Sequence, residues 1–416
     1  VNVNYRYIAN ELIYLLENAD ATVCVFAAEF ADQVSSIRSQ LPKVTQWIQI
    51  EDGFSGLEDV IAYEDYATQG DGSSLDIKRE STDQLFIYTG GTTGMPKGVM
   101  WSHDALWNVL GAGGNARLGI AGSESIVEHC NRVANNPSPP VTLPLPPIMH
   151  GTGLLSTVGA MTNGGTCITL TSKSFEAELA LQAIDQHKVT TVVIVGDAFA
   201  RPMLNALEIA KENNQPYDLS SLKQITSSGV MWSAEVKAGL LKHHDMRLMD
   251  TMGSTEGGMG ASVSTRDSMA ETATFKLNPG MIVLKDNGEL VEPGSDDTGL
   301  LGISGDMAMI PIGYYKDAKK SAETFREYKG TRYSFPGDYA KIESDGSIIL
   351  LGRGSNCINS AGEKIYPEEV EEALKKDPLV FDCLVVGVPD ERFGQKIVAI
   401  VSTVGNKMVD EAELLG

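Results

Sequence analysis

The sequence predicts an α/β fold of layered sheets, divided into two or three subdomains, with a small α+β domain at the carboxyl end. Helical and β-type patterns alternate at the amino end, with one apolar helical face over residues 5–19 and a β-type run at 22–26. Residues 189–195 are a continuous run of β-branched side chains, typical of a strand buried in a parallel sheet. A chain of 416 residues is also too long for one simple core.

The other elements are predicted in chain order from the same kinds of pattern. Strands are expected at 45–50, 84–88, 224–230, 347–351, 384–388 and 396–401, and a helix at 104–110. Three prolines within 141–151 favour an extended segment. Asp345-Gly346 is typical of a hairpin turn, and Pro367 suits the first turn of a helix.

Composition restricts the class of partner. Hydrophobic residues make up 42% and charged residues 21%, as in an ordinary globular enzyme. Lys and Arg number 33 against 55 Asp and Glu, a net charge of −22, which opposes binding to nucleic acid and to anionic membranes. We expect no transmembrane segment, and a cytoplasmic protein, because the apolar stretches are short, no signal peptide heads the chain and the cysteines are scattered without a C-x-x-C pair.

A glycine- and threonine-rich loop at residues 88–98 is the most informative stretch. It follows the predicted strand 84–88 and reads Tyr-Thr-Gly-Gly-Thr-Thr-Gly-Met-Pro-Lys-Gly. Glycines let the backbone approach a ligand closely, and the exposed N–H groups and threonine hydroxyls suit phosphate. Lys97 adds a positive charge next to Pro96, whose φ is fixed. The stretch therefore predicts a solvated loop that binds a triphosphate.

Three other interpretations of the glycine-rich stretches are less consistent with the sequence. A Walker A loop fails because Gly98 stands where its hydroxyl residue is required. Residues 111–116 fit G-x-G-x-x-A but follow a helical pattern rather than a strand, which argues against a dinucleotide site. The third alternative is a flexible turn without function, and the proline and lysine so close to a strand end argue against it.

The loop at residues 88–98 resembles the signature loop of the adenylate-forming (ANL) superfamily, which includes acyl-CoA synthetases, luciferases and peptide-synthetase adenylation domains. The continuation Gly-Val-Met-Trp through Trp101 most resembles the acyl-CoA synthetase branch, particularly bacterial ligases for fatty and steroid side-chain acids. The similarity extends over nearly the whole chain. It implies a large adenylation domain at 1–352 with a small β-barrel-like subdomain that includes residues 296–302 and 313–315, a hinge at 353–356, and a small domain at 357–416.

The resemblance also implies the nucleotide site. Within the Tyr-Gly-x-Thr-Glu-like segment at 252–256, Thr255 would contact the α-phosphate and Glu256 would hold magnesium, whereas Met252 replaces the aromatic residue that usually covers adenine. The alternative for Glu256 is an ordinary acid at a helix start. Together with Lys97 as a catalytic residue, the residues implied for cofactor binding are Thr89, Gly90, Gly91, Thr92, Thr93, Gly94, Ser228, Gly229, Val230, Met252, Gly253, Ser254, Asp338, Arg353 and Lys364.

Three of these residues come from the region near the hinge. A Pro-Gly turn projects Asp338, whose carboxylate oxygens can accept hydrogen bonds from two ribose hydroxyls. Arg353 is expected to reach ribose or phosphate. Ser355 stands where the family usually has Asp or Lys, and Lys364 lies in the segment that would approach the site for thioester formation.

The acyl group is implied to lie near His150, Gly151 and Phe199. For His150 the alternative is a structural histidine, and for Phe199 it is a plain core residue. Hydrophobic lining alone does not separate fatty, aromatic and steroid acids.

The resemblance implies an acyl-CoA synthetase that uses ATP, Mg²⁺ and coenzyme A to activate a hydrophobic carboxylic acid as acyl-AMP and then form the thioester. It also implies a homodimer. The alternatives are an adenylation-only family member and a non-catalytic nucleotide-binding protein. The ends of the sequence suggest part of a longer protein. No segment after residue 401 matches the setting of the family's C-terminal lysine, so we expect this chain to adenylate poorly.

Overall fold

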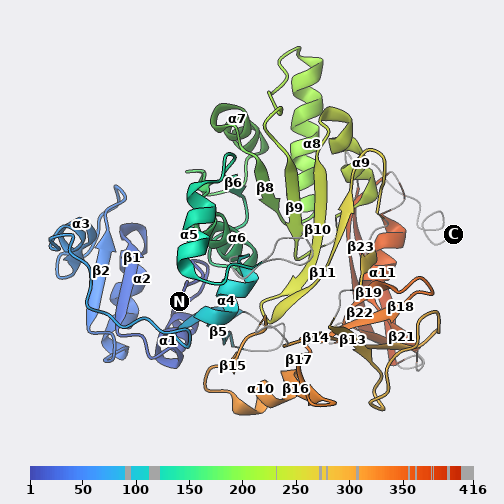
Figure 1. Ribbon diagram of the computed structural model, residues 1–416. Coiled ribbons are helices and arrows are strands. Elements are labelled where there is room, and N and C mark those ends of the chain that lie inside the picture. Colours follow the sequence, from blue (N-terminus) through green and yellow to red (C-terminus); the bar gives the residue numbers. More distant parts are fainter. Residues whose placement is uncertain are drawn as a thin grey trace.

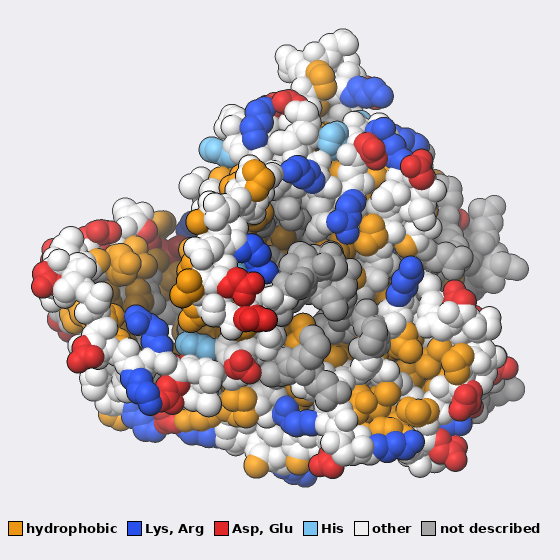
Figure 2. Space-filling view, viewed as in Figure 1, with side chains coloured by type: hydrophobic (Ala, Val, Ile, Leu, Met, Phe, Trp, Pro, Cys, Tyr) orange, Lys and Arg blue, Asp and Glu red, His pale blue; other side chains and the backbone are white. Residues whose placement is uncertain are grey.

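The computed structural model describes residues 1–89, 95–111, 122–230, 232–270, 274–277, 280–305, 309–354, 357–360, 363–375, 377, 379–390 and 394–403. Within these residues the strands form five sheets, and helices pack on the amino-terminal sheet and on the central sheet that contains β6 to β11 (Figure 1). No helix in this part of the chain is long and apolar enough to cross a membrane. On the face drawn in Figure 2, basic and acidic side chains are interspersed rather than segregated by sign.

The amino-terminal unit, blue in Figure 1, has the predicted alternation of helix and strand. Its strands form a parallel sheet in the order β1-β2-β3, and Val23 pairs with Gln46. Tyr88 belongs to the same core, and its hydroxyl donates to Asn18 Oδ1 at 2.5 Å, which joins this unit to the strand before the phosphate loop. The elements are α1 (Ala9–Asn18), β1 (Val23–Ala27), η1 (Ala28–Phe30), α2 (Ala31–Ile37), η2 (Arg38–Gln40), β2 (Gln46–Ile50), β3 (Ile61–Ala62) and α3 (Tyr63–Ala67).

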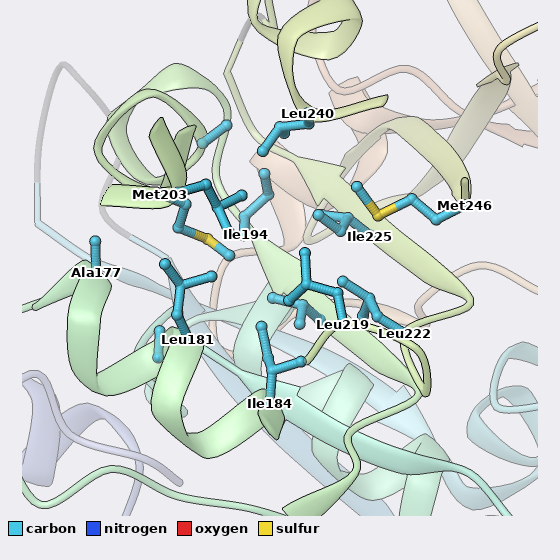
Figure 3. Close-up of a cluster of buried hydrophobic side chains, with 14 of the residues drawn as sticks. Ala177, Leu181, Ile184, Ile194, Met203, Leu219, Leu222, Ile225, Leu240 and Met246 are labelled. Atoms are coloured by element: carbon cyan, nitrogen blue, oxygen red, sulfur yellow. The ribbon is translucent and has the colours of Figure 1, made fainter. Parts of the chain in front are cut away.

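The largest hydrophobic cluster lies on the central sheet, whose order is β11-β10-β9-β8-β6-β7. All neighbours are parallel except β10 and β11. Figure 3 shows side chains from α7, α8 and α9 meeting those of the strands, with Leu181, Met203 and Ile225 near the middle. The predicted buried parallel strand is therefore confirmed. The elements are α5 (Ile126–Ala134), β6 (Val141–Pro144), α6 (Gly151–Thr162), β7 (Thr166–Cys167), α7 (Ala177–His187), β8 (Thr191–Ile194), α8 (Asp197–Glu212), β9 (Gln224–Ser228), α9 (Ala234–His243), β10 (Arg247–Ser254) and β11 (Gly257–Ser264).

The phosphate-loop motif joins two antiparallel strands, β4 (Gln84–Thr89) and β5 (Lys97–Ser102), and α4 (His103–Val109) follows them. Lys97 pairs with Thr89 and is the first residue of β5, so the prediction that it lies in a solvated loop is wrong. The reason is the hairpin itself, because the return strand begins at the lysine. The third strand of this sheet is β15 (Gly313–Tyr314). The prediction that residues 313–314 belong to the barrel-like sheet is therefore wrong.

The barrel-like subdomain is an antiparallel sheet in the order β12-β19-β18-β14-β17-β16, with β13 paired to β14. The predicted hairpin turn at Asp345-Gly346 is confirmed: Gly346 has φ +81°, and the Glu343 N–H donates to the Ser347 carbonyl at 2.8 Å. The elements are β12 (Thr274–Lys276), β13 (Met281–Leu284), β14 (Thr298–Ser304), α10 (Ala318–Thr324), β16 (Phe325–Tyr328), β17 (Thr331–Ser334), β18 (Asp338–Ile342) and β19 (Ser347–Arg353).

The carboxyl-terminal part has an antiparallel sheet in the order β21-β20-β23-β22 and one described helix, as expected for a small α+β domain. Pro367 is the first residue of that helix, as predicted. The Tyr366 ring lies 6.2 Å from the Tyr339 ring of β18, so the two parts touch. The elements are β20 (Ile358–Ser360), β21 (Glu363–Ile365), α11 (Pro367–Leu374), β22 (Val380–Asp390) and β23 (Gly394–Thr403).

Candidate active site

One cavity of about 1890 Å³ lies among the central sheet, β4, α6, the barrel-like subdomain and the small carboxyl-terminal sheet. The predicted site residues that line it are Thr89, His150, Gly151, Ser228, Gly229, Val230, Met252, Gly253, Ser254, Thr255, Asp338 and Arg353. Gly90, Gly91, Thr92, Thr93 and Gly94 lie outside the described residues, as do Ser355 and Asn356 of the predicted hinge. Lys364 is in β21, but its side chain is outside the description.

Strand register brings two of the predicted segments together. β9 and β10 are parallel, and Thr251 pairs with Ser228, so both strands end on the same edge of the sheet. Beyond Ser228 the chain turns through Gly229, whose φ of +98° is the left-handed conformation that favours glycine. Met252 is on β10, 6% exposed, and lines the same cavity. A buried thioether and an open backbone turn therefore lie at one edge of the sheet.

Thr255 and Glu256 form the turn between β10 and β11, where Ser254 pairs with Gly257. This position excludes the alternative that Glu256 begins a helix. The buried Trp101 of β5 donates from Nε1 to the Thr255 carbonyl oxygen at 3.0 Å. This bond ties the turn to the strand that starts at Lys97.

The Glu256 carboxylate is 7% exposed and accepts a hydrogen bond from the Tyr314 hydroxyl at 2.7 Å. Thr255 and Gly257 line the cavity on either side, whereas Glu256 does not line it. Burial, together with the negative charge of Glu256, raises the pKa of Tyr314 well above its usual value. Tyr314 therefore remains a hydrogen-bond donor at any physiological pH.

Lys97 forms an ion pair rather than extending into solvent. Its Nζ lies 2.7 Å from Asp317 Oδ2 and 5.7 Å from the centre of the Tyr314 ring. Asp317 is the N-cap of α10, where its other carboxylate oxygen accepts the Lys320 N–H at 3.0 Å. The Lys97 ammonium and this backbone bond hold the pKa of Asp317 below its usual value.

Asp338 is a buried carboxylate that lines the cavity at the start of β18. It pairs with Arg353 of β19, whose Nε lies 3.6 Å from Asp338 Oδ1. Its other oxygen, Oδ2, is buried without a hydrogen-bond partner in the described structure. Burial raises the pKa of Asp338, Arg353 lowers it, and the nearby Glu256 raises it further. Asp338 can therefore accept a hydrogen bond from a ligand.

The residues implied for acyl binding separate into two groups. His150 is the N-cap of α6, and Gly151 follows it; a Cβ placed on Gly151 would lie 3.9 Å from Thr255 Oγ1. Partial burial, with Arg6 nearby, lowers the pKa of His150. Phe199 does not line the cavity. Its ring packs 4.7 Å from Phe175 against the central core, which matches the alternative of a core residue, and its neighbour Ala198 lines the cavity instead.

Sequence reasoning missed a buried ion pair beside the cavity. Asp250 lines the cavity two residues before Met252, and its Oδ2 lies 3.0 Å from Nζ of Lys237 on α9. Burial raises the pKa of Asp250, while Lys237 opposes that rise. The signal was present in the sequence, since Asp250 lies between Leu248 and Met252 on the buried face of a strand. Trp101, Tyr314 and Asp317 carried no such local signal.

Comparison with known proteins identifies one enzyme family along most of the chain. The AMP-binding enzyme family matches residues 1–315, and the AMP-binding enzyme C-terminal domain matches residues 369–415. The 3-oxocholest-4-en-26-oate–CoA ligase of Rhodococcus rhodochrous is 41% identical over 428 residues, covering 100% of this chain and 75% of that protein. A medium/long-chain-fatty-acid–CoA/3-oxocholest-4-en-26-oate–CoA ligase of Mycolicibacterium smegmatis is 42% identical over 414 residues, covering 96% of this chain and 73% of that protein.

Solved structures share the fold. The anthranilate CoA ligase AuaEII in complex with anthranoyl-AMP superposes with a TM-score of 0.79 at 21% identity, over 99% of this chain and 74% of that one. ATP-bound MatB from Rhodopseudomonas palustris superposes with a TM-score of 0.77 at 21% identity, over 99% and 75%. At these identities the likeness concerns the fold.

Proposed function

Since the chain belongs to the AMP-binding enzyme family, we propose that it is an acyl-CoA ligase that activates a hydrophobic carboxylic acid with ATP and transfers the acyl group to coenzyme A. The observation that carries this proposal is a single cavity in which the edge of the parallel sheet, the Thr255 turn and the buried Asp338 meet. The two relatives above, both named as CoA ligases, support the second half of the reaction.

In the first half-reaction, a carboxylate oxygen of the acid attacks the α-phosphorus of ATP, and pyrophosphate leaves. Negative charge on the phosphate oxygens needs positioned donors rather than a side-chain nucleophile. We assign phosphate contacts to Lys97 and to the Thr255 hydroxyl. In the second half-reaction, the thiol sulfur of coenzyme A attacks the acyl carbon, the thiol proton is released, and AMP leaves.

Nucleotide binding is assigned from the geometry of the cavity. Met252 and the backbone at Gly229 and Val230 would contact adenine, since they lie together at the sheet edge. The unpartnered Asp338 Oδ2 would accept a hydrogen bond from a ribose hydroxyl, and Arg353 would contact ribose or phosphate. Each assignment uses a group that already faces the cavity.

Magnesium fits the donors present only if substrate oxygens complete its shell. No cluster of three or more acidic, histidine or cysteine side chains suitable for a metal occurs in the described part of the chain. One carboxylate, Glu256, accompanied by ATP phosphate oxygens is the arrangement that Mg²⁺ commonly uses in nucleotide enzymes. When bound, the ion neutralises charge on the phosphates.

The substrate class rests on the cavity's apolar lining and on the relatives. Volumes of 300–1,000 Å³ are usual for small-ligand sites, so about 1890 Å³ is room for a nucleotide together with a large acyl group. Apolar lining residues on several elements include Ile87, Trp101, Val109, Leu155, Pro202 and Phe275. We therefore propose medium- or long-chain fatty acids or steroid side-chain acids as substrates.

The test is a pyrophosphate-release screen over carboxylic acids of graded size, each with and without coenzyme A. A CoA ligase gives acid-dependent pyrophosphate and a thioester product. An adenylation-only enzyme gives pyrophosphate without thioester, and a non-catalytic binding protein gives neither.

We further propose a cytoplasmic enzyme that forms a homodimer. The cytoplasmic location rests on the scattered cysteines without a C-x-x-C pair, which are typical of reduced thiols, and the homodimer rests on the family resemblance alone. Light scattering at micromolar concentration tests the dimer, because a monomer mass of 44.7 kDa would contradict it.

A further inference from the structure

Tyr314 occupies a fixed position beside both charged groups assigned to the first half-reaction. It lies on β15 and is 6% exposed, and β15 pairs with β5 so that Tyr314 is opposite Val99. Its backbone N–H donates to Ser321 Oγ at 2.8 Å, and its ring lies 5.7 Å from that of Phe325. Backbone pairing, the hydrogen bond to Ser321 and ring packing therefore leave the side chain little freedom.

The Tyr314 hydroxyl makes a hydrogen bond that restrains Glu256. It donates to Oε1 at 2.7 Å, the one side-chain hydrogen bond that the Glu256 carboxylate makes within the described residues. A glutamate side chain is flexible, and a hydrogen bond to one carboxylate oxygen removes part of that freedom. It also limits where the other oxygen can lie, because both oxygens are bound to the same carbon.

The same ring lies next to the phosphate-loop lysine. Lys97 Nζ is 5.7 Å from the ring centre, and Lys97 begins the strand with which β15 pairs. One aromatic side chain thus contacts the ammonium group through its face and the carboxylate through its hydroxyl. The two charged residues are 159 positions apart in the sequence, from 97 to 256, and Tyr314 lies between them in space.

We propose that Tyr314 is a positioning residue for the carboxylate assigned to magnesium: its hydroxyl holds Glu256 Oε1 in the turn whose neighbouring residues, Thr255 and Gly257, line the cavity. This rests on the proposed function only in assigning Glu256 to magnesium. Partners that orient a metal ligand typically change metal affinity by 10–100-fold when they are removed. Loss of the hydroxyl should therefore act on the magnesium requirement rather than on the maximal rate.

The experiment compares Tyr314→Phe with Tyr315→Phe. The first substitution keeps the ring beside Lys97 and Phe325 and removes only the hydroxyl. Tyr315 is a matched control, since its hydroxyl also donates to a carboxylate, Asp20 Oδ2 at 2.8 Å, and Asp20 is not a residue of the proposed site. For each protein, ATP affinity is measured by calorimetry over a magnesium titration, without acid or CoA, and the melting temperature is recorded.

For Tyr314→Phe we expect the magnesium concentration that gives half-maximal ATP binding to rise by about tenfold, with binding restored at saturating magnesium. Tyr315→Phe should match the wild type. Glu256→Gln should show the same rise or a larger one, and combining it with Tyr314→Phe should add nothing, because Tyr314 acts through Glu256.

An unchanged magnesium requirement in Tyr314→Phe would overturn the proposal, as would a rise equal to that of Tyr315→Phe. ATP binding that is weakened equally at every magnesium concentration would also overturn it, because that pattern indicates a general structural role. If Tyr314→Phe fails to fold, Glu256→Gln is measured alone, and an unchanged magnesium requirement in that variant would overturn the proposal, because Glu256 would then not be the magnesium ligand. Since binding is measured without turnover, a failure of the ligase function in the acid screen is a separate outcome.

Discussion

Lys97 Nζ and Asp317 Oδ2 lie 2.7 Å apart although the two residues are separated by 220 positions in the sequence. The pair joins the first residue of β5 to the N-cap of α10. Both side chains remain partly open, at 38% and 34% exposure, so the ammonium is restrained without being sealed from a ligand. If the Lys97 ammonium left Asp317 and paired with phosphate oxygens instead, Lys97 would contact ATP.

This geometry predicts that Lys97→Ala loses activity while it keeps its fold. A positioned donor to a developing oxyanion is worth about 3–4 kcal/mol in other enzymes, so pyrophosphate release should fall at least about a hundredfold. A half-exposed ion pair contributes about 1 kcal/mol or less, so the melting temperature should change little. Lys285→Ala, which breaks an exposed pair with Asp297 of 3.0 Å, is the matched control and should keep full activity. Wild-type kinetics in Lys97→Ala would remove Lys97 from the site.

Breaking the buried pair of Lys237 and Asp250, in contrast to the Lys97 pair, should lower the stability of the protein strongly. Their side chains are 1% and 9% exposed, so Lys237→Met leaves the Asp250 carboxylate buried without its cation. Breaking such a pair costs about 3–5 kcal/mol, whereas replacing both partners with apolar groups is often neutral. Urea denaturation should show this loss in the single variant and recovery in Lys237→Met/Asp250→Leu. Equal stability of the wild type and Lys237→Met would contradict the prediction.

The buried Asp338 carboxylate should lower the stability of the fold when it is ionised, while it contributes to ligand binding. Burial raises its folded pKa above the unfolded value of 3.8, so the folded state binds the proton more tightly. The carboxylate's contribution to stability therefore falls as pH rises from 3.8 towards the raised folded pKa, and ionised Asp338 is destabilising above it. Asp338→Asn should show a smaller loss of stability over that window and weaker AMP binding at neutral pH.

Two measurements check this prediction: thermal denaturation from pH 4 to 7, and calorimetry with AMP. Asp286→Asn offers a control outside the cavity, on the far side of Tyr339. AMP affinity that is unchanged in Asp338→Asn would exclude Asp338 from ribose binding.

The predicted hinge at 353–356 gives a further kinetic prediction. Ser355→Pro restricts the backbone where the large domain is proposed to end, although Ser355 itself lies outside the described residues. We expect acyl-adenylate formation to be retained better than thioester formation when the two half-reactions are measured separately. Equal losses in both would show that Ser355 is not the pivot.

Sequence reasoning succeeded where local chemistry decides the structure. The β-branched run at 189–195 became β8, and the Asp-Gly turn and Pro367 were each placed correctly, because these residues restrict their own backbone. It failed where the structure depends on distant pairing. Nothing near Gly313 indicates that β15 joins β5. The error over Lys97 has a different origin, because the return strand of the local β4–β5 hairpin begins at the lysine.

The candidate site shows the same division. Motifs identified the cavity residues from 252 to 255 and Asp338, since those stretches are contiguous. The partners that orient the charged groups, Tyr314 and Asp317, come from another part of the chain, so no local pattern could indicate them. The prediction for Phe199 is wrong by one position, since Ala198 lines the cavity and Phe199 packs against Phe175.

The most direct test of the ligase function is a product analysis under single-turnover conditions. The protein is mixed with ATP, magnesium and a medium-chain fatty acid or a steroid side-chain acid, and AMP and acyl-CoA are quantified with and without coenzyme A. Although adenylation by this chain is expected to be slow, we predict one acyl-CoA per AMP when coenzyme A is present, and enzyme-bound acyl-AMP with pyrophosphate when it is absent. Formation of ADP, or release of acyl-AMP with no thioester in the presence of coenzyme A, would contradict the assignment as an acyl-CoA ligase.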